Sequence, residues 1–294
     1  MEQLPVSLIR VTAVNRITPR TTRVTFTAPA LAELGEGWPD QQMKLCFPRP
    51  GQAGPRLPAA EPDGDVMRWY QAFLAIPEHE RPWMRSFTVR ARRPHRAEID
   101  VDFVLHGDCG PAGRWAAAAA SGDVLGMVGP SAAYARAPRP ADWLLLAGDE
   151  TALPAVAGLA EALPEGARAI AYLEVADRDE EQPFPTRGEL TVHWLHRDGV
   201  PAGRGTALVD AVRGALLPPG TGSAWLAGEA GTVRALRRHL VGERRLDRRS
   251  VEFAGYWRLD LTQDDAPTPE DLAEAGERLA DLRADGDAPG VAGA

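Results

Sequence analysis

The chain changes character at residues 143–163, which read WLLLAGDETALPAVAGLAEAL. Residues 143–147 form a short, fully apolar run of the kind found in buried parallel strands. A loop of four residues follows, and an alanine- and leucine-rich helix then extends to residue 163. This succession of strand, loop and helix predicts the start of an α/β domain.

The same rhythm continues to residue 258. Apolar strands are expected at residues 167–175, 189–195, 223–227 and 251–256, with helices at 205–215 and 232–240. Strands and helices that alternate in this way build a parallel sheet with helices on both faces. We therefore predict a doubly wound parallel α/β domain over residues 141–258.

The chain before residue 137 has a different pattern. Short apolar and β-branched runs, separated by turn-forming residues, cover residues 6–14, 22–27, 43–47, 86–89, 99–105 and 124–128. They predict an antiparallel sheet or small barrel over residues 5–136, with one helix at 111–120. The stretch 48–82, rich in proline, glycine and charge, is expected to be a flap or a disordered crossing. The predicted fold class is two-domain α+β, a barrel followed by an α/β domain.

The composition narrows the classes of partner. The 294 residues are 44% hydrophobic and 25% charged, as in an ordinary globular protein, and the net charge of -8 disfavours nucleic acid. The chain has no apolar run of about 18 residues and no basic, apolar leader at its start. We expect a cytoplasmic protein without a membrane span, either a monomer or a weak dimer.

Metal chemistry has no support in the sequence. Cys46 and Cys109 lack the spacing of a zinc or iron-sulfur site. No ligand constellation involves the histidines, and we assign no role to His79, His95, His193, His196 and His239. The basic residues are nearly all arginine, and Lys44 is the only lysine, which makes it a position of interest.

Two charged segments close the chain. The arginines of residues 234–249 accompany an apolar stripe of Val233, Leu236 and Leu240, so a solvated amphipathic helix is favoured over a basic binding patch. Residues 259–294 form an acidic tail with a helix expected at 269–282. A loosely attached tail is favoured there, with a cap or partner-contact helix as the alternative.

A first candidate site lies in the barrel, where residues 85–90 read RSFTVR. Strand alternation puts Arg85 and Phe87 on one face and Thr88 on the other, a spacing that suits a flavin. Residues 106–115 join a strand end to a helix start, whose free N–H groups attract anions. A pyrophosphate could bridge this helix start and Arg85, and a capped helix that binds nothing is the alternative.

A second candidate site lies at the carboxyl edge of the predicted parallel sheet. The loops at residues 148–154 and 228–231 leave two strands at this edge, where open α/β sheets bind ligands. Neither loop reads GxGxxG, so neither alone identifies a dinucleotide site. Glu174 has the position of an acid that binds an adenosine ribose, and nearby Arg178 could accept a 2'-phosphate. The choice between NADH and NADPH stays open.

Together these motifs resemble one family, the siderophore-interacting proteins, which are FAD-dependent NAD(P)H ferric-siderophore reductases of the ferredoxin-reductase superfamily. The resemblance rests on residues 85–90, 101–107 with 110–112, 148–155, 228–231 and 255–258, in family order, and spans about residues 5–258. It implies that electrons pass from NAD(P)H through FAD to siderophore-bound Fe(III), so that Fe(II) is released.

The resemblance also implies roles for single residues. Arg85 would hold the FAD pyrophosphate, Phe87 would pack on the flavin and Thr88 would hydrogen-bond near flavin N5, with no obligatory catalytic acid or base. The other expected FAD contacts are His106, Gly107, Gly110, Ala112 and Gly113. The expected nicotinamide-dinucleotide contacts are Gly148, Asp149, Glu150, Thr151, Glu174, Gly228 and Glu229. Tyr256 or Trp257 would shield the flavin, and Lys44 and Arg258 would contact the anionic ferric siderophore.

Three departures from the family pattern put the strength of binding in question. Phe87 stands where the family usually has tyrosine, Gly113 replaces a common serine, and Ser131 stands where some members have arginine. Two alternative functions follow. One is a general flavin reductase or diaphorase with another acceptor, and the other is a non-catalytic siderophore-binding module.

Overall fold

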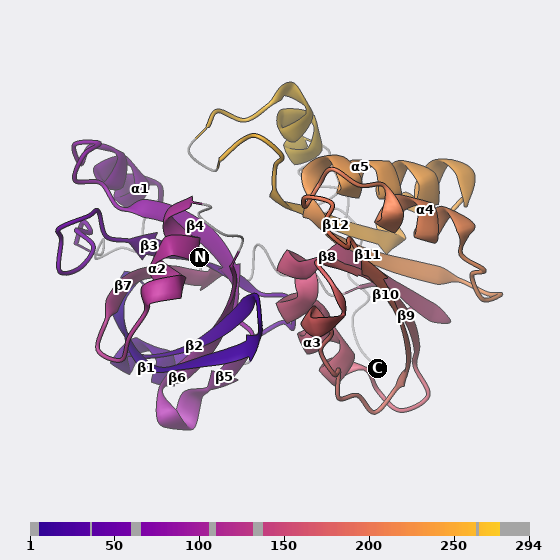
Figure 1. The fold of residues 1–294 in the computed structure, drawn as a ribbon, viewed down its shortest axis with the longest axis horizontal. Coiled ribbons are helices and arrows are strands. Elements are labelled where there is room, and N and C mark those ends of the chain that lie inside the picture. The colour runs from indigo at the N-terminus through magenta and orange to yellow at the C-terminus, as the bar shows by residue number, and fades with distance from the viewer. Residues whose placement is uncertain are drawn as a thin grey trace, which may run out of the picture.

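The computed structural model describes residues 6–35, 37–59, 66–105, 110–131, 138–262 and 265–276. Two sheets lie beside each other, a curved antiparallel sheet from the first half of the chain and a helix-covered parallel sheet from the second (Figure 1). No helix in the described ranges is long and apolar enough to cross a bilayer.

The first sheet has seven antiparallel strands in the order β4-β3-β7-β1-β2-β6-β5. Their bounds are β1 Val6–Thr18, β2 Thr21–Thr27, β3 Gln42–Phe47, β4 Trp83–Thr88, β5 Ala91–Arg93, β6 Glu98–Val104 and β7 Val124–Ser131. Only two residues separate β4 from β5, which are the two edge strands. One short stretch of chain therefore joins the two edges of this curved sheet, which is called the barrel below.

The inside of this sheet is an apolar core. Its largest fully buried side chains include Phe26, Phe47, Phe103, Ile99 and Leu125. Helix α2, Gly110–Ala118, covers one end through Trp115, whose ring packs against Phe26, Phe47 and Phe103. The short helices η1 Pro29–Glu33 and η2 Pro94–Arg96 complete this half.

The second sheet has five parallel strands in the order β10-β9-β8-β11-β12. Their bounds are β8 Trp143–Asp149, β9 Arg168–Val175, β10 Glu189–His196, β11 Gly222–Glu229 and β12 Val251–Trp257. The order reverses beside β8, the first of these strands in the chain. Ligands of open α/β sheets bind at such a switch point, outside the carboxyl ends of the strands.

Helices cover both faces of the parallel sheet (Figure 1). Helix α3, Leu153–Ala162, packs on the face that includes Leu146 and Leu173. Helices α4, Ala207–Gly214, and α5, Ala230–Arg238, pack on the other face. The remaining short helices are η4 Glu150–Ala152, η5 Arg178–Glu180, η6 His239–Glu243 and η7 Arg248–Ser250. The expected doubly wound α/β architecture is confirmed.

Two expectations need correction. Part of the stretch expected to be a flap or disordered crossing is helix α1, Val66–Leu74. Trp69 and Phe73, four residues apart, are buried against Cys46 and Val128, and this packing offsets the cost of ordering the helix. Residues 269–276 are helical, and Asp271 pairs with both Arg258 and Arg234, so this part of the tail is tied to the parallel-sheet domain.

The amphipathic helix expected within residues 234–249 is present as far as residue 243, as α5 and η6, and residues 244–247 are not helical. Val233, Leu236 and Leu240 are buried, whereas Arg238 and Arg245 are exposed. Among the described residues no group of three or more histidines, cysteines or carboxylates could hold a metal ion. Cys109 lies outside the described residues.

Candidate active site

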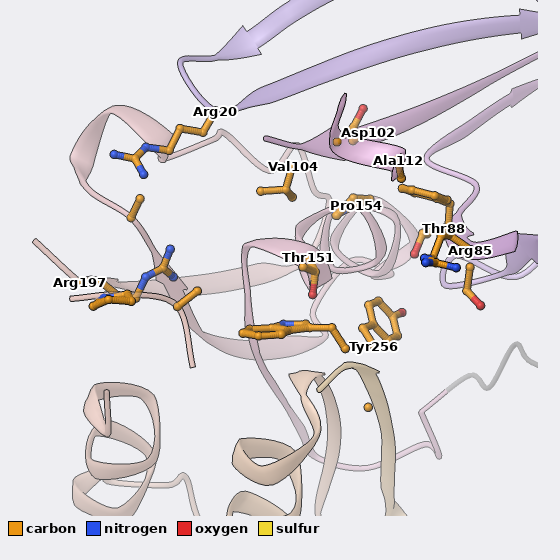
Figure 2. Close-up of a pocket in the computed structure, with 18 of the residues that line it drawn as sticks. Arg20, Arg85, Thr88, Asp102, Val104, Ala112, Thr151, Pro154, Arg197 and Tyr256 are labelled. Atoms are coloured by element: carbon orange, nitrogen blue, oxygen red, sulfur yellow. The ribbon is translucent and has the colours of Figure 1, made fainter. Parts of the chain in front are cut away.

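A cavity of about 1130 Å³ lies between the two sheets and is lined by residues of both (Figure 2). It exceeds the roughly 300–1,000 Å³ of a usual small-molecule pocket. Figure 2 shows Arg85, Thr88 and Ala112 at one end and Arg20 and Arg197 at the other. A site of this length can hold two large ligands that meet in the middle.

The cavity gathers many of the residues that the sequence singles out. Those on its wall are Arg85, Phe87, Thr88, Ala112 and Gly113 from the barrel, and Thr151, Tyr256 and Trp257 from the α/β domain. The wall does not include Lys44, Gly110, Gly148, Asp149, Glu150, Glu174, Arg178, Gly228, Glu229 and Arg258. His106 and Gly107 lie outside the described residues. Ser131 ends β7.

Strand β4 forms the barrel side of the cavity. The Phe87 ring packs on Phe103, with ring centroids 4.6 Å apart, and on Phe47, so it belongs to the aromatic core as well as to the wall. Phe87 carries no hydroxyl, so it offers a ligand an aromatic surface without a hydrogen-bonding group. Gly113, on the first turns of α2, has open space where a side chain would stand, so that space is available to a ligand.

Two buried hydroxyl groups lie on the wall of the cavity. The Thr88 Oγ1 and the Tyr256 hydroxyl are buried, and neither has a hydrogen-bond partner in good geometry within the described ranges. Burial raises the pKa of the Tyr256 hydroxyl, with Thr88 and Gln42 close enough to oppose that rise. Tyr256 is therefore protonated at neutral pH and can donate. Buried polar groups normally have partners, so these two hydroxyls fit a ligand with polar ring edges, such as a flavin.

Beneath the other side of the cavity lies Asp149, at the carboxyl end of β8. Its carboxylate accepts hydrogen bonds from the Thr151 backbone and hydroxyl, the Glu229 backbone N–H and the Trp257 indole N–H. Burial raises the pKa of Asp149 to about 6, and the charge of Glu150 adds to that effect. Asp149 thus links three strand ends through protein donors instead of facing the cavity.

Glu150 and Glu174 form a buried cluster with Arg197. The guanidinium of Arg197 donates two hydrogen bonds to Glu150, at 2.5 and 2.6 Å, and lies 3.6 Å from a carboxylate oxygen of Glu174. Burial raises the pKa of Glu174, against the opposing effect of Arg197. Glu174, which was expected to bind a ribose, therefore pairs with Arg197.

Other residues supply the wall at this far end, and the sequence reasoning missed them. Asp177 follows β9 by two residues, and Asp198 follows β10 by two. Arg20, from the turn between β1 and β2, lies 3.7 Å from Asp177. The position of Asp177, just past the second parallel strand, is a signal that sequence reasoning could have used.

The two residues expected to bind the substrate have partners of their own. Lys44 on β3 lies opposite Ser86 on β4 and donates a 2.6 Å hydrogen bond to its hydroxyl. Burial lowers the pKa of Lys44, and Arg85 lowers it further. Ser86 lines the cavity, so the ammonium lies directly behind the wall. Arg258 donates to Asp271 at 2.7 Å and to the carbonyl oxygens of Thr262 and Ala266.

The chain has the two-domain fold seen in ferredoxin reductases. A ferredoxin reductase from a carbazole 1,9a-dioxygenase has the same fold, with a TM-score of 0.58 over 87% of this chain and 71% of that chain, at 15% identity. The family model described as the siderophore-interacting FAD-binding domain matches residues 10–134, and that of the siderophore-interacting protein matches residues 141–260. The chain belongs to the siderophore-interacting protein family.

Individual relatives agree with this assignment. The chain is 34% identical to the ferric vibriobactin reductase ViuB of Vibrio cholerae, over 80% of this chain and 83% of that protein. A siderophore utilization protein from T. fusca has a TM-score of 0.79 and 36% identity, covering 90% of this chain and 97% of that chain. The siderophore-interacting protein SipS from Aeromonas hydrophila has a TM-score of 0.72 and 30% identity, covering 95% and 100%.

Proposed function

We propose that this protein is a ferric-siderophore reductase, which uses NADH or NADPH and FAD to reduce siderophore-bound Fe(III) in the cytoplasm. The observation that carries the proposal is a cavity lined by both domains, at whose barrel end two buried hydroxyls have no hydrogen bond in good geometry among the described residues. The similarity to a ferric vibriobactin reductase supports the choice of acceptor. A monomer or weak dimer is part of the same proposal.

The residues at the barrel end fit FAD. Arg85 and the first turns of α2 supply positive charge and N–H groups for the pyrophosphate. Phe87 provides an aromatic surface, and Thr88 and Tyr256 provide hydroxyls for the polar edge of the ring. Bound FAD would supply the chemistry that converts two-electron donation by a nicotinamide into one-electron reduction of iron.

The residues of the α/β domain fit a nicotinamide dinucleotide laid across the carboxyl edge of the sheet. Thr151 and Pro154, at the start of α3, stand between the barrel end and the far end (Figure 2). Of the two aromatic residues at the end of β12, Tyr256 would cover the flavin until the nicotinamide arrives, and Trp257 would line the entry beside it. Asp177 and Asp198 at the far end place carboxylates where ribose hydroxyls would lie.

Lys44 and Arg258 remain the proposed contacts for the siderophore. A partly buried ammonium in a protein of net charge -8 provides a local attraction for an anionic complex. Arg258 would have to exchange its pairing with Asp271 for the substrate. Hard oxygen donors hold Fe(II) far less well than Fe(III), so reduction releases the iron.

The test is an anaerobic assay with FAD-loaded protein, a panel of ferric siderophores, both nicotinamides and an Fe(II)-trapping chelator. We expect trapped Fe(II) to appear with saturation in at least one ferric siderophore. Reduction of dyes and ferric salts without such saturation would instead identify a general flavin reductase. A loaded protein whose yellow colour NADH and NADPH both fail to bleach would identify a non-catalytic module.

A further inference from the structure

Asp149 lies out of reach of the cavity yet contacts two residues that form its wall. Its Oδ1 accepts hydrogen bonds from the N–H and hydroxyl of Thr151, at 2.9 and 2.5 Å. Its Oδ2 accepts from the backbone N–H of Glu229 and the indole N–H of Trp257, each at 2.8 Å. Only 6% of Asp149 is exposed, whereas Thr151 and Trp257 line the cavity.

Two glycines leave room for the carboxylate of Asp149 and the indole of Trp257. Gly228 has φ of +137°, and a Cβ there would stand 2.6 Å from the Asp149 Oδ2. Gly203 has φ of +71°, and a Cβ there would stand 2.8 Å from the Trp257 ring. Glycine adopts such positive φ values without strain, and it leaves room for the close approach of a side chain. A side chain at position 228 would therefore clash with the Asp149 carboxylate, and one at position 203 would clash with the Trp257 indole.

We propose that Asp149 is a positioning residue for the nicotinamide. Asp149 acts by fixing the indole of Trp257 in the wall of the cavity. The inference rests on the proposed function, because it assumes that a nicotinamide enters beside Trp257. It assigns Asp149 an indirect role, through Trp257, in place of direct contact with the dinucleotide.

The electrostatics explain why the indole is held. If Trp257 turned away, a buried carboxylate would lose one of its four donors, and unsatisfied buried polar groups are costly. The carboxylate is held by β8, β11 and β12, all from the α/β domain. Asp149 should therefore affect the KM for the nicotinamide and leave the affinity for FAD, which the barrel residues hold, nearly unchanged.

The first test observes the indole directly by NMR of ¹⁵N-labelled protein without nicotinamide or siderophore. The protein has 8 tryptophans, and the Trp257 resonance is the one that Trp257→Phe removes. In the wild type we expect its N–H to exchange with solvent far more slowly than that of Trp38, which is 52% exposed. Exchange as fast as that of Trp38 would overturn the proposal even if no Asp149 variant folds.

Asp149→Asn should shift the Trp257 resonance and speed its exchange. The matched control is Asp142→Asn, because Asp142 lies just before the other end of β8 and accepts two hydrogen bonds from Thr221 away from the cavity. We expect the control to leave the Trp257 resonance in place. An unmoved Trp257 resonance in Asp149→Asn would contradict the proposal, whatever the reductase assay shows.

The second test is a double-mutant cycle on flavin reduction by the nicotinamide. Asp149→Asn and Trp257→Phe should each raise the KM by about tenfold, as expected for loss of a hydrogen bond to a charged group. The double variant should resemble Trp257→Phe, because both changes remove the same interaction. A hundredfold rise in the double variant, or a tenfold loss of FAD affinity in Asp149→Asn, would overturn the inference.

Discussion

The backbone N–H of Arg20 donates a 2.8 Å hydrogen bond to Glu180, 160 residues later in the chain. The same carboxylate accepts from the hydroxyls of Thr18 and Thr21, so η5 of the α/β domain is joined to the turn between β1 and β2. Glu180 is buried, at 3% exposed. This contact fixes the two domains at the far end of the cavity.

Replacing Glu180 by alanine should destabilise the protein, because it leaves three buried donors without their acceptor. We expect a loss of about 1–3 kcal/mol in the free energy of unfolding, measured in urea. Asp179→Ala is the control, since Asp179 is an exposed neighbour on the same short helix. Equal stability of Glu180→Ala and the control would contradict this account of the contact.

Thr88→Val tests the flavin end of the cavity. Its hydroxyl has no hydrogen bond in good geometry among the described residues, although the Tyr256 hydroxyl lies close to it, so its removal should cost the FAD-free protein at most about 1 kcal/mol of stability. The affinity for FAD, measured by quenching of flavin fluorescence, should fall by about tenfold for one lost hydrogen bond. An unchanged affinity for FAD would show that the Thr88 hydroxyl does not contact the flavin.

Thr25→Val is the matched control for that experiment. Thr25 is a buried threonine of the same sheet whose hydroxyl donates to Asp100 at 2.8 Å. We expect it to lose about 1–3 kcal/mol of stability, because Asp100 loses a donor, and to keep its affinity for FAD.

Asp149 should make stability depend on pH in an unusual direction. Its folded-state pKa of about 6 lies above its ordinary value of 3.8, so the folded protein binds more protons than the unfolded chain between these values. Stability from this group is present in full below about pH 4 and is lost as pH rises through 6, by on the order of 3 kcal/mol. Two charged residues lie near Asp149. The charge of Glu150 raises the pKa of Asp149 further, and Arg197 donates hydrogen bonds to Glu150.

The measurement compares urea unfolding of the wild type and Asp149→Asn from pH 4.5 to 7.5. Asparagine carries no charge at any pH in this range, so the wild type should lose stability relative to the variant as pH rises. A difference that is constant over the range would show that Asp149 does not titrate there.

Glu174 and Asp177 should respond differently to loss of charge. Glu174→Gln removes a buried charge and leaves the two hydrogen bonds from Arg197 to Glu150, so it should change stability by less than about 1 kcal/mol and leave the KM for the nicotinamide within about twofold. Asp177→Asn keeps an N-cap, and it should raise that KM several-fold with little loss of stability. A raised KM for Glu174→Gln, with an unchanged KM for Asp177→Asn, would instead indicate that Glu174 binds the ribose.

Much of the fold follows from local patterns in the chain. The alternation of apolar strands and helices after residue 140 predicts the parallel sheet, because each strand of such a sheet is buried on both faces. The loop after β8 was expected at the carboxyl edge for the same reason. Helix α1 was missed, since Trp69 and Phe73 stand in a segment whose proline, glycine and charge content outweighs two aromatic residues.

The site was less predictable than the fold. Arg85 and Thr88 could be named from the strand pattern of residues 85–90, whereas Tyr256 and Trp257 could be named only through the family resemblance. The partners of Glu174 and Asp149 could not be named, because Arg197 follows β10, the strand beside β9, and Trp257 ends β12, which lies two strands away from β8. Such contacts depend on strand order, which the local pattern does not specify.

The central claim is that a ferric siderophore takes electrons from the flavin held between these domains. The most direct measurement is an anaerobic single turnover, in which FAD-loaded protein is first reduced by one equivalent of nicotinamide and then mixed with excess ferric siderophore. The account predicts that the yellow colour returns at a rate that saturates with siderophore, with two Fe(II) trapped per flavin. A flavin that stays reduced, or that reoxidises without Fe(II), would contradict it.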